Sequence, residues 1–357
     1  MKTFRNGVIH LRRQAPRKRC KNKILIVPPG RIFPSLLTSG YKIVLDICAT
    51  LKKQHYEIWL MHPGPVHGGI PTYFDRVITF NVMPPSLNRY ERVFFEKKWF
   101  KALICMLNLK LFLILWRLMK LIDIVVVYCI NFFLPCVLVA KMIKKPLVLI
   151  FGDIVSVAYR RFKARGYTNM PSVLIHMLLA LERIAASAAD KVVTISYLDE
   201  KVIRSWDVAG KSICIPLSLD LSKIQRALSF NCHDYFFKRL NTLKSLGYKV
   251  VMFHGDMTYP PNKDAALFLI KNVAPAVLRE RPETVFTIIG PWDRRPKVND
   301  NRIVITGFVN NLFKYLELAD VAAVPLFAGA GVKNKVLEYM ALGKPIISTA
   351  IGVEGLK

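Results

Sequence analysis

A glycine-rich stretch near the C-terminus combines residue types that suit a bound phosphate. Residues 329–332 (Gly-Ala-Gly-Val) precede a predicted helix that carries Lys333, Lys335 and Glu338. A loop at the start of a helix exposes unpaired backbone N–H groups and the positive end of the helix dipole, and both favour an anion. The lysines add positive charge, and the carboxylate can accept hydrogen bonds from vicinal hydroxyls. The stretch therefore predicts a site for a nucleotide diphosphate with its ribose.

Each of these side chains also has a plainer interpretation. Lys333 and Lys335 could be ordinary solvated helix residues, and Glu338 could pair with Lys335 three positions earlier. Lys333 is the stronger phosphate candidate, because the sequence places it in the first helical turn, where the dipole disfavours a positive side chain. Glu338 is expected at the edge of the buried face of the helix, beside apolar positions that point to a core. Both interpretations stay open at the level of the sequence.

The same glycines partly match a dinucleotide-binding fingerprint. The spacing of Gly329 and Gly331 fits, but Asn334 stands where the third glycine belongs. The acidic residue expected about twenty positions further on has no strand to carry it. The pattern therefore disfavours a dehydrogenase.

A series of blocks places this stretch in a wider pattern. Their composition and order resemble the C-terminal half of family-4 glycosyltransferases of the GT-B fold, and the likeness extends in outline over residues 23–357. The blocks lie at residues 253–265, 286–290, 304–309, 319–326, 329–345 and 352–356. The resemblance implies two Rossmann-like α/β domains that face a cleft. It also implies that a sugar moves from a nucleotide-diphosphate sugar with retention at the anomeric carbon, with no metal and no other cofactor.

The resemblance further implies roles in donor binding. Glu338 matches the second glutamate of the family's Glu-x7-Glu motif, which binds the ribose, whereas the first glutamate falls at Ala330. The backbone of the glycine loop and the Lys333 ammonium would then hold the diphosphate. The predicted donor-binding residues are Gly255, Phe308, Val309, Gly329, Ala330, Gly331, Val332, Lys333, Lys335 and Glu338.

Two of these positions carry an open question. The family often has an arginine and a lysine in the loop after Gly255, and this chain has Asp256 and Pro261 at those places. Phe308 ends a predicted strand where the family places the nucleotide base, but its ring could equally belong to the core.

Signals for the acceptor are weaker and lie in the first half of the chain. A Pro- and Gly-rich segment from Pro28 to Gly40, which includes Gly30, is a predicted strand-to-helix loop at the family's acceptor site. Gly30 and Gly40 are the predicted acceptor-binding residues. Asp153 ends another predicted strand and is the candidate catalytic residue, because it could orient a sugar hydroxyl; it could also cap the segment that follows. The family often has a histidine before this aspartate, where this chain has Gly152.

Strands and helices alternate along the whole chain, which predicts α/β architecture with doubly wound parallel sheets. We expect three parts: a basic arm at 1–22, an acceptor domain at 23–216 and a nucleotide-sugar domain at 217–357. Expected strands lie at 23–28, 56–61, 77–80, 123–128, 146–151, 191–196, 212–216, 249–254, 284–289, 302–306, 321–325 and 345–348. Expected helices lie near 40–53, 91–118, 131–144, 171–189, 197–206, 262–280, 310–318 and 334–342.

The charge of the chain is strongly positive and uneven. Residues 1–216 hold 34 Lys and Arg against 12 acids, whereas residues 217–357 hold 19 against 12. Such a field attracts polyanions, either a nucleic acid or an anionic membrane. Between residues 97 and 120 the basic residues alternate with Leu, Ile, Phe and Trp, as in a helix that lies in a membrane interface. A core helix with a solvated basic face explains the same run equally well.

We expect a cytoplasmic protein that is peripheral at the inner face of the cell membrane. The N-terminus has no signal-peptide pattern, and the seven cysteines form no CxxC pair, which favours reduced thiols and argues against a metal site. Residues 121–140 are apolar enough to raise the question of a membrane span, but the β-branched run at 123–128 favours a buried strand. The expected partners are a nucleotide sugar, a glycan or lipid-linked acceptor and an anionic membrane surface, with no specific nucleic acid.

An alternative function belongs to a different class. Members of the family usually continue through further helices beyond the position of Lys357, so the second domain would be incomplete here. Together with Ala330 and Gly152, this allows a catalytically silent GT-B remnant that only binds a membrane or another polyanion.

Overall fold

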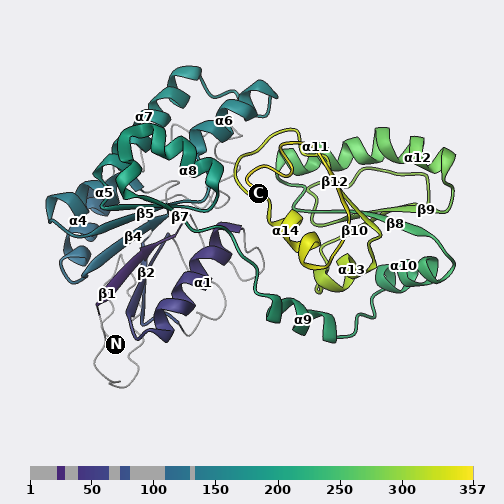
Figure 1. The fold of residues 1–357 in the computed structure, drawn as a ribbon, viewed down its shortest axis with the longest axis horizontal. Coiled ribbons are helices and arrows are strands. Elements are labelled where there is room, and N and C mark those ends of the chain that lie inside the picture. The colour runs from purple at the N-terminus through teal and green to yellow at the C-terminus, as the bar shows by residue number, and fades with distance from the viewer. Residues whose placement is uncertain (1–21, 29–38, 64–72, 81–108, 129–132, 357) are drawn as a thin grey trace. The chain divides into compact units, whose positions relative to one another are not determined.

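The computed structural model describes residues 22–28, 39–63, 73–80, 109–128 and 133–356, and it divides the chain into two compact units (Figure 1). The first unit ends at Leu217 and the second begins at Ser218, one residue from the predicted boundary. The basic arm lies outside the described residues. Each unit is an α/β domain with its own core.

The first unit is built on seven parallel strands in the order β3-β2-β1-β4-β5-β6-β7. The central strands are apolar along their whole length, as expected for strands covered on both faces. The seven strands are β1 (Lys23–Val27), β2 (Glu57–Pro63), β3 (Arg76–Phe80), β4 (Ile124–Tyr128), β5 (Leu147–Phe151), β6 (Lys191–Thr194) and β7 (Ser212–Cys214).

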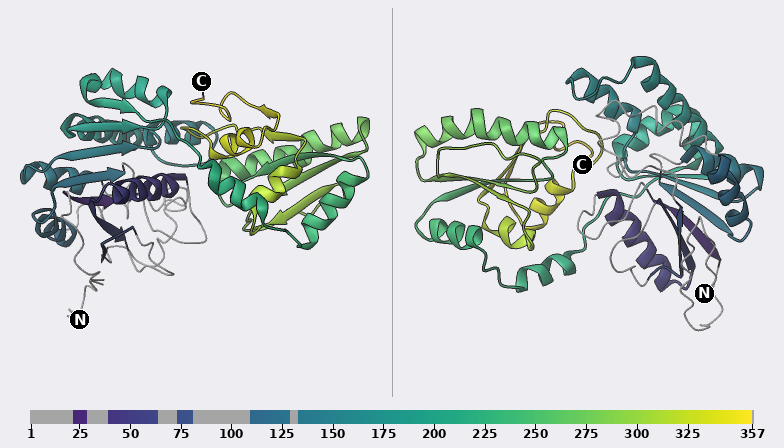
Figure 2. Two further views of the ribbon diagram at one scale, coloured as in Figure 1. Left: turned by 60° about the horizontal axis from the view of Figure 1, so that its bottom comes forward. Right: turned by 180° about the vertical axis from the view of Figure 1, so that it is seen from behind.

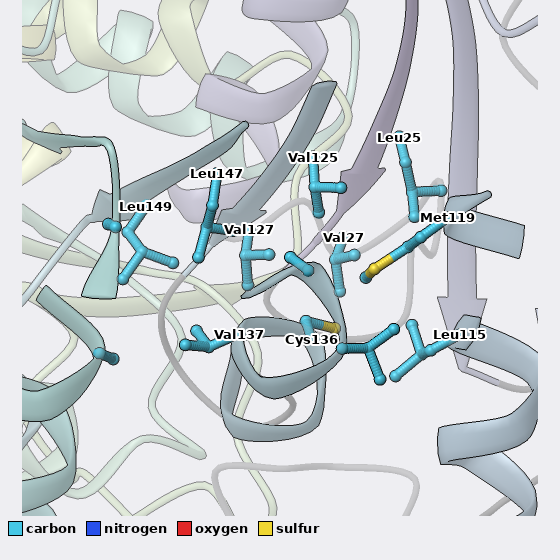
Figure 3. Packing of buried hydrophobic residues seen from close by; sticks show 14 of the residues in the cluster. Leu25, Val27, Leu115, Met119, Val125, Val127, Cys136, Val137, Leu147 and Leu149 are labelled. Carbon is cyan, nitrogen blue, oxygen red and sulfur yellow. The ribbon is translucent and has the colours of Figure 1, made fainter. Parts of the chain in front are cut away.

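Helices cover both faces of this sheet (Figure 2). One face packs against α4 (Leu109–Met119), α5 (Phe133–Met142), α7 (Ser172–Ala188) and the segment of α8 (Tyr197–Ile203) with its following π-helical turn (Arg204–Val208). Figure 3 shows Leu115 and Met119 of α4 and Cys136 and Val137 of α5 against the strand residues of this core. The other face packs against α1 (Ser39–Lys53), and α6 (Val155–Ala164) packs against α7.

The second unit has five parallel strands in the order β10-β9-β8-β11-β12. They are β8 (Lys249–His254), β9 (Thr284–Ile289), β10 (Ile303–Gly307), β11 (Val321–Val324) and β12 (Ile346–Ser348). The helices are α9 (Leu221–Ser229), α10 (Tyr235–Ser245), α11 (Pro260–Phe268), α12 (Ala274–Glu280), α13 (Leu312–Leu318) and α14 (Asn334–Ala341). A π-helical turn (Leu269–Val273) joins α11 to α12.

Aspartates that precede strands tie neighbouring strands together. Each accepts a hydrogen bond from the backbone N–H of a residue at the start of an adjacent strand, at 2.7–2.9 Å, which fixes the relative position of the two strands. The pairs are Asp75 with Ile58, Asp123 with Lys23, Asp190 with Leu147, and Asp320 with Val250.

All twelve predicted strands are confirmed, with small shifts at their ends. Among the described residues, three helices were not predicted, namely α6, α9 and α10, although the apolar residues of α9 and α10 recur at helical spacing. The predicted helix at 91–118 is described only from Leu109, where it forms α4. Residues 121–140 form the turn into β4, β4 itself and most of α5, so the buried-strand interpretation is confirmed within the described part. Among the described residues, every helix is too short or too polar to cross a membrane.

Candidate functional site

Three glycine turns meet at the C-terminal ends of β8, β9 and β10. Gly255 follows β8, Gly290 follows β9 and Gly307 ends β10. The Gly255 N–H donates to the carbonyl of Ile289 at 3.0 Å, and the Gly290 N–H donates to the carbonyl of Gly307 at 2.8 Å. Gly290 has φ +135°, and a Cβ there would lie 1.8 Å from the Gly255 carbonyl oxygen. Glycine is therefore required where these turns approach each other.

The glycine loop leads into α14 from the same edge of the sheet, since it follows β11. Gly329 and Gly331 have φ +129° and +66°, conformations that glycine adopts without strain. Within the described part of the chain, the backbone N–H groups of Gly331, Val332 and Asn334 donate to no protein acceptor. These groups form the donor array that the sequence predicts for an anion.

Lys333 lies just before the helix rather than in its first turn. It is the N-cap residue, with extended backbone and no side-chain cap. Its Nζ donates to the carbonyl oxygens of Ala330 and Gly331, at 2.9 and 2.5 Å. The ammonium therefore folds back on the glycine loop and holds its shape, in addition to lying beside the predicted phosphate position.

Lys335 is buried, so its interpretation as a solvated helix residue is wrong. Its Nζ lies 2.7 Å from Oδ1 of Asn262 in α11 and 4.1 Å from the ring centre of Phe253 in β8. A Cβ on Gly255 would come within 2.9 Å of the same Nζ, so the ammonium lies directly against the Gly255 turn. Burial lowers the pKa of Lys335 to about 7, and the Lys333 ammonium adds to this effect against the opposing charge of Glu338.

Glu338 is also buried, deeper than the predicted position at the edge of the core. Its Oε2 lies 2.8 Å from Nε2 of His254, the last residue of β8. The His254 ring packs against Tyr339 with 5.0 Å between ring centres. The imidazole therefore fixes the orientation of the carboxylate, and Lys335 has its own hydrogen-bond partner in Asn262.

The structure thus brings Gly255, Lys335 and Glu338 together through two residues that sequence reasoning missed, His254 and Asn262. His254 had a detectable signal, because it is a polar residue at the end of an apolar strand within one of the conspicuous blocks. Asn262 had none, since its role depends on how α11 packs against α14.

Phe308 and Val309 follow β10 at the same edge of the sheet. The Phe308 side chain is 63% exposed, so its interpretation as a core residue is wrong, whereas Val309 packs partly against the core. Arg295, which the sequence did not single out, reaches this point: its Nη2 donates to the carbonyl of Thr306 at 3.3 Å. An exposed aromatic ring beside a guanidinium can stack on a planar base and donate hydrogen bonds to it.

In the first unit, Asp153 lies after β5 and just before α6. The N-cap residue of α6 is Ile154, and the N–H groups of Val155 and Ser156 donate to the buried carboxylate of Glu182 from α7, at 2.8 and 3.4 Å. Burial raises the pKa of Glu182 to about 7. Glu182 was not predicted, because a lone acid in a helical sequence carries no distinguishing signal.

A steric constraint explains why residue 152, just before Asp153, is a glycine. A Cβ on Gly152 would lie 1.5 Å from Oη of Tyr128, so the Tyr128 side chain occupies the space that a side chain at position 152 would take. Of the predicted acceptor residues, Gly30 lies outside the described residues. Gly40 lies in the first turn of α1 and not in the loop before it, because the helix already begins at Ser39.

The comparison with protein families concerns the second unit. Residues 248–356 match the family described as Glycosyl transferases group 1. This is the segment in which the conspicuous blocks fall. The finer assignment to family 4 stays a prediction. Among curated protein sequences, none matches this chain.

Solved structures match the chain over nearly its full length. Anabaena HepE in complex with UDP and glucose has a TM-score of 0.59 at 14% identity, over 92% of this chain and 80% of that protein. Sucrose-phosphate synthase from Thermosynechococcus elongatus gives 0.63 at 14% identity, over 93% and 82%. A glycosyltransferase from Rickettsia africae gives 0.59 at 16% identity, over 93% and 80%. At such low identity these matches establish the fold, which is GT-B with two Rossmann-like domains.

Proposed function

We propose that this chain is a glycosyltransferase whose second unit binds a nucleotide-diphosphate sugar. The observation that carries the proposal is the cluster at the strand ends, where the glycine turns, the start of α14, Lys335 and the His254–Glu338 pair come together. The match of residues 248–356 to group 1 glycosyl transferases supports it. HepE, which shares the fold, is a protein whose structure holds UDP and glucose.

The diphosphate would lie against the N–H groups of Gly331, Val332 and Asn334. When the bond from the sugar to the diphosphate breaks, negative charge grows on the leaving nucleotide. Fixed N–H dipoles stabilise this charge at little reorganisation cost, because they are already oriented before the reaction. The Lys333 and Lys335 ammonium groups add positive charge beside the phosphate position. They would compensate for the arginine and lysine that the family often has in the loop after Gly255 and that this chain lacks. We propose that this set of groups acts without a metal.

The ribose and the base would extend along the same edge of the sheet. The Glu338 carboxylate, oriented by His254, can accept hydrogen bonds from the ribose hydroxyls. The exposed Phe308 ring offers a face for the base. Retention at the anomeric carbon follows from the resemblance to family-4 enzymes and belongs to this proposal.

The first unit would bind the acceptor, a glycan or a lipid-linked sugar at a membrane surface. Asp153 is the candidate that would orient the acceptor hydroxyl, because it follows the buried strand β5 and precedes a helix that Glu182 holds in place. Transfer of labelled sugar to a lipid extract or to a soluble glycan distinguishes the two acceptor classes.

Titration calorimetry with UDP, GDP, ADP and CDP tests donor binding directly. We expect at least one nucleoside diphosphate to bind the full chain, and Glu338→Gln to weaken it by at least tenfold, because a ribose hydrogen bond to a charged group contributes about 1.5–3 kcal/mol. Glu317→Gln, on the exposed face of α13, is the matched control and should bind as the parent does. Absence of binding by all four nucleotides would contradict the proposal.

One observation favours a second candidate, the catalytically silent remnant. Ala330 stands where the family's first motif glutamate would contact the sugar, and Asp256 and Pro261 stand where the family often has its diphosphate-binding cations. A folded chain that binds none of the four nucleoside diphosphates, but does bind an anionic membrane or another polyanion, would fit this second function.

A further inference from the structure

The helices α4, α5 and α7 form one layer over the first unit's sheet. They precede β4, β5 and β6, which are neighbours in the sheet and run parallel. Helices that connect parallel strands on one face run side by side in the same direction. The packing of α5 against both α4 and α7, and their shared core, agree with this arrangement (Figure 1). Side chains that do not face the sheet therefore form a single outward surface.

This outer helical face is apolar to an unusual degree. On α7, Val173, Met177 and Ile184 are 63%, 47% and 58% exposed, and their spacing of four and seven residues puts them in one stripe along the helix. The remaining apolar members of the face, each half exposed or more, are Leu113 on α4 with Leu138 and Met142 on α5. Contiguous exposed apolar side chains of this kind mark an interaction surface.

The exposed charges carried by the three helices themselves have one sign. The three helices carry a single acid, Glu182, and it is buried against the start of α6. Among the side chains that the structure describes on these helices, the exposed charges are Arg117, Lys141 and Arg183. The acids in the turns after α4 and α7, Asp123 and Asp190, accept backbone hydrogen bonds from Lys23 and Leu147. Asp190 also pairs with the Lys141 ammonium at 3.6 Å, so Arg117 and Arg183 are the cations that this face offers to an anionic partner.

A surface with apolar stripes between cations fits an anionic lipid bilayer better than the other polyanions. A bilayer accepts aliphatic side chains at the acyl boundary while its headgroups bind Lys and Arg. An RNA would call for aromatic rings that stack on bases, and the exposed large apolar residues of these three helices are all aliphatic. A second copy of the same face would bring like charges together. We propose that the outer helical face of α4, α5 and α7 docks on an anionic membrane. The proposal is independent of the donor site and holds for an active or a silent enzyme.

Sedimentation of the full chain with lipid vesicles tests this surface. One set of vesicles is phosphatidylcholine alone, and the other contains one third phosphatidylglycerol. We expect binding to the anionic vesicles that weakens as salt rises. Met177→Glu combined with Ile184→Glu should lower the partition coefficient at least tenfold, because two apolar anchors are lost and two negative charges are added. Arg117→Gln should lower it about fivefold on anionic vesicles only.

Leu221→Glu combined with Leu246→Glu provides the matched control, since both leucines are well exposed on the second unit. This variant should partition as the parent does, and all variants should keep the parent's unfolding temperature and UDP binding. Unchanged partition of the folded Met177/Ile184 variant would overturn the proposal. The proposal would also be overturned if an RNA oligomer displaced the vesicles and still bound after the glutamate substitutions. It would likewise be overturned if the parent were a dimer and the Met177/Ile184 variant lost vesicle binding only because it had become a monomer.

Discussion

In each unit a buried charged side chain holds a helix that follows a strand, and the two charges have opposite sign. In the first unit, the Glu182 carboxylate from α7 accepts hydrogen bonds from the first N–H groups of α6, which follows β5. In the second, the Lys335 ammonium from α14 donates to Asn262 of α11, which follows β8. Both charges hold a helix at the C-terminal end of a strand, the edge at which parallel α/β sheets bind ligands.

Burial moves the two pKa values to about 7 from opposite directions. Each buried charge therefore lowers the stability of its unit. We infer that the role of both charges is to position the loop beside them. The loop beside Glu182 carries Asp153, and the turn beside Lys335 carries Gly255. The difference in sign fits the expected ligands, because only the second unit is proposed to bind an anion at the C-terminal ends of its strands.

The largest expected effect tests whether the second unit depends on its glycine turns. Gly290→Ala should lower the free energy of unfolding of this unit by about 3–5 kcal/mol, because the new Cβ meets the Gly255 backbone and the positive φ is strained. Gly343→Ala is the control: its φ is also positive, but its Cβ would meet no atom within 4 Å, so about 1 kcal/mol is expected. Hydrogen exchange followed by mass spectrometry reports each unit separately. Equal losses of unfolding free energy for the two substitutions would show that the close approach of Gly290 to the Gly255 backbone does not determine the stability of this unit.

Removal of the buried carboxylate should damage the first unit alone. Glu182→Ala leaves the N–H groups of Val155 and Ser156 buried without their acceptor, so we expect a loss of about 2–4 kcal/mol, measured by denaturant unfolding. Since the folded pKa is raised from 4.5 to about 7, the unit binds more protons than the unfolded chain in this range. Stability of the parent should therefore fall as pH rises from 4.5 to 7, and Glu182→Gln should abolish this slope. A slope that persists in the variant would assign it to another group.

Lys335 should give the opposite pH dependence in the second unit. Its folded pKa is lowered from 10.5 to about 7, so the unfolded chain binds more protons in this range and stability should rise with pH. Lys335→Met should remove this slope, raise stability by about 1–3 kcal/mol near neutral pH, and weaken binding of nucleoside diphosphate about tenfold. Lys271→Met, on the exposed surface, is the control. Nucleotide binding that survives Lys335→Met unchanged would limit the lysine to a structural role.

The smallest effect compares the strand-start aspartates across the units. Asp190→Asn and Asp320→Asn each weaken one hydrogen bond to a neighbouring strand, and we expect about 1 kcal/mol for each, measured by thermal unfolding. The pKa of Asp320 is lowered because the Val250 N–H and the Lys244 ammonium outweigh its partial burial. Its contribution should therefore be lost as pH falls through this lowered value. A loss that differs between the two substitutions by more than about 1 kcal/mol would contradict the expected equality.

The sequence predicted the strands well because each is a short apolar run between turn residues, and the parallel sheets follow from the alternation. In the second unit the glycines were informative as well. Gly307 and Gly331 have positive φ, which glycine adopts without strain, and a Cβ on Gly255 would meet Lys335 and Asn262, so these glycines mark the site in the sequence.

Side-chain partnerships were not predictable in the same way. Lys335 is expected on a helix surface from its charge alone, and only the packing of α11 and Phe253 shows that it is buried. The pairing of Glu338 with His254 spans 84 residues of chain, and no local pattern specifies it. In the first unit the acceptor hypothesis depended on single residues such as Asp153, which are too common to be diagnostic.

Backbone amide exchange with and without UDP tests the donor site most directly. With the nucleoside diphosphate that binds the chain, for example UDP, we expect slower exchange of the amides from Gly331 to Asn334, because they would donate to its phosphates, and no change in α9. Nucleotide binding without protection of this segment, or with protection confined to the first unit, would contradict the assignment of the nucleotide to the start of α14.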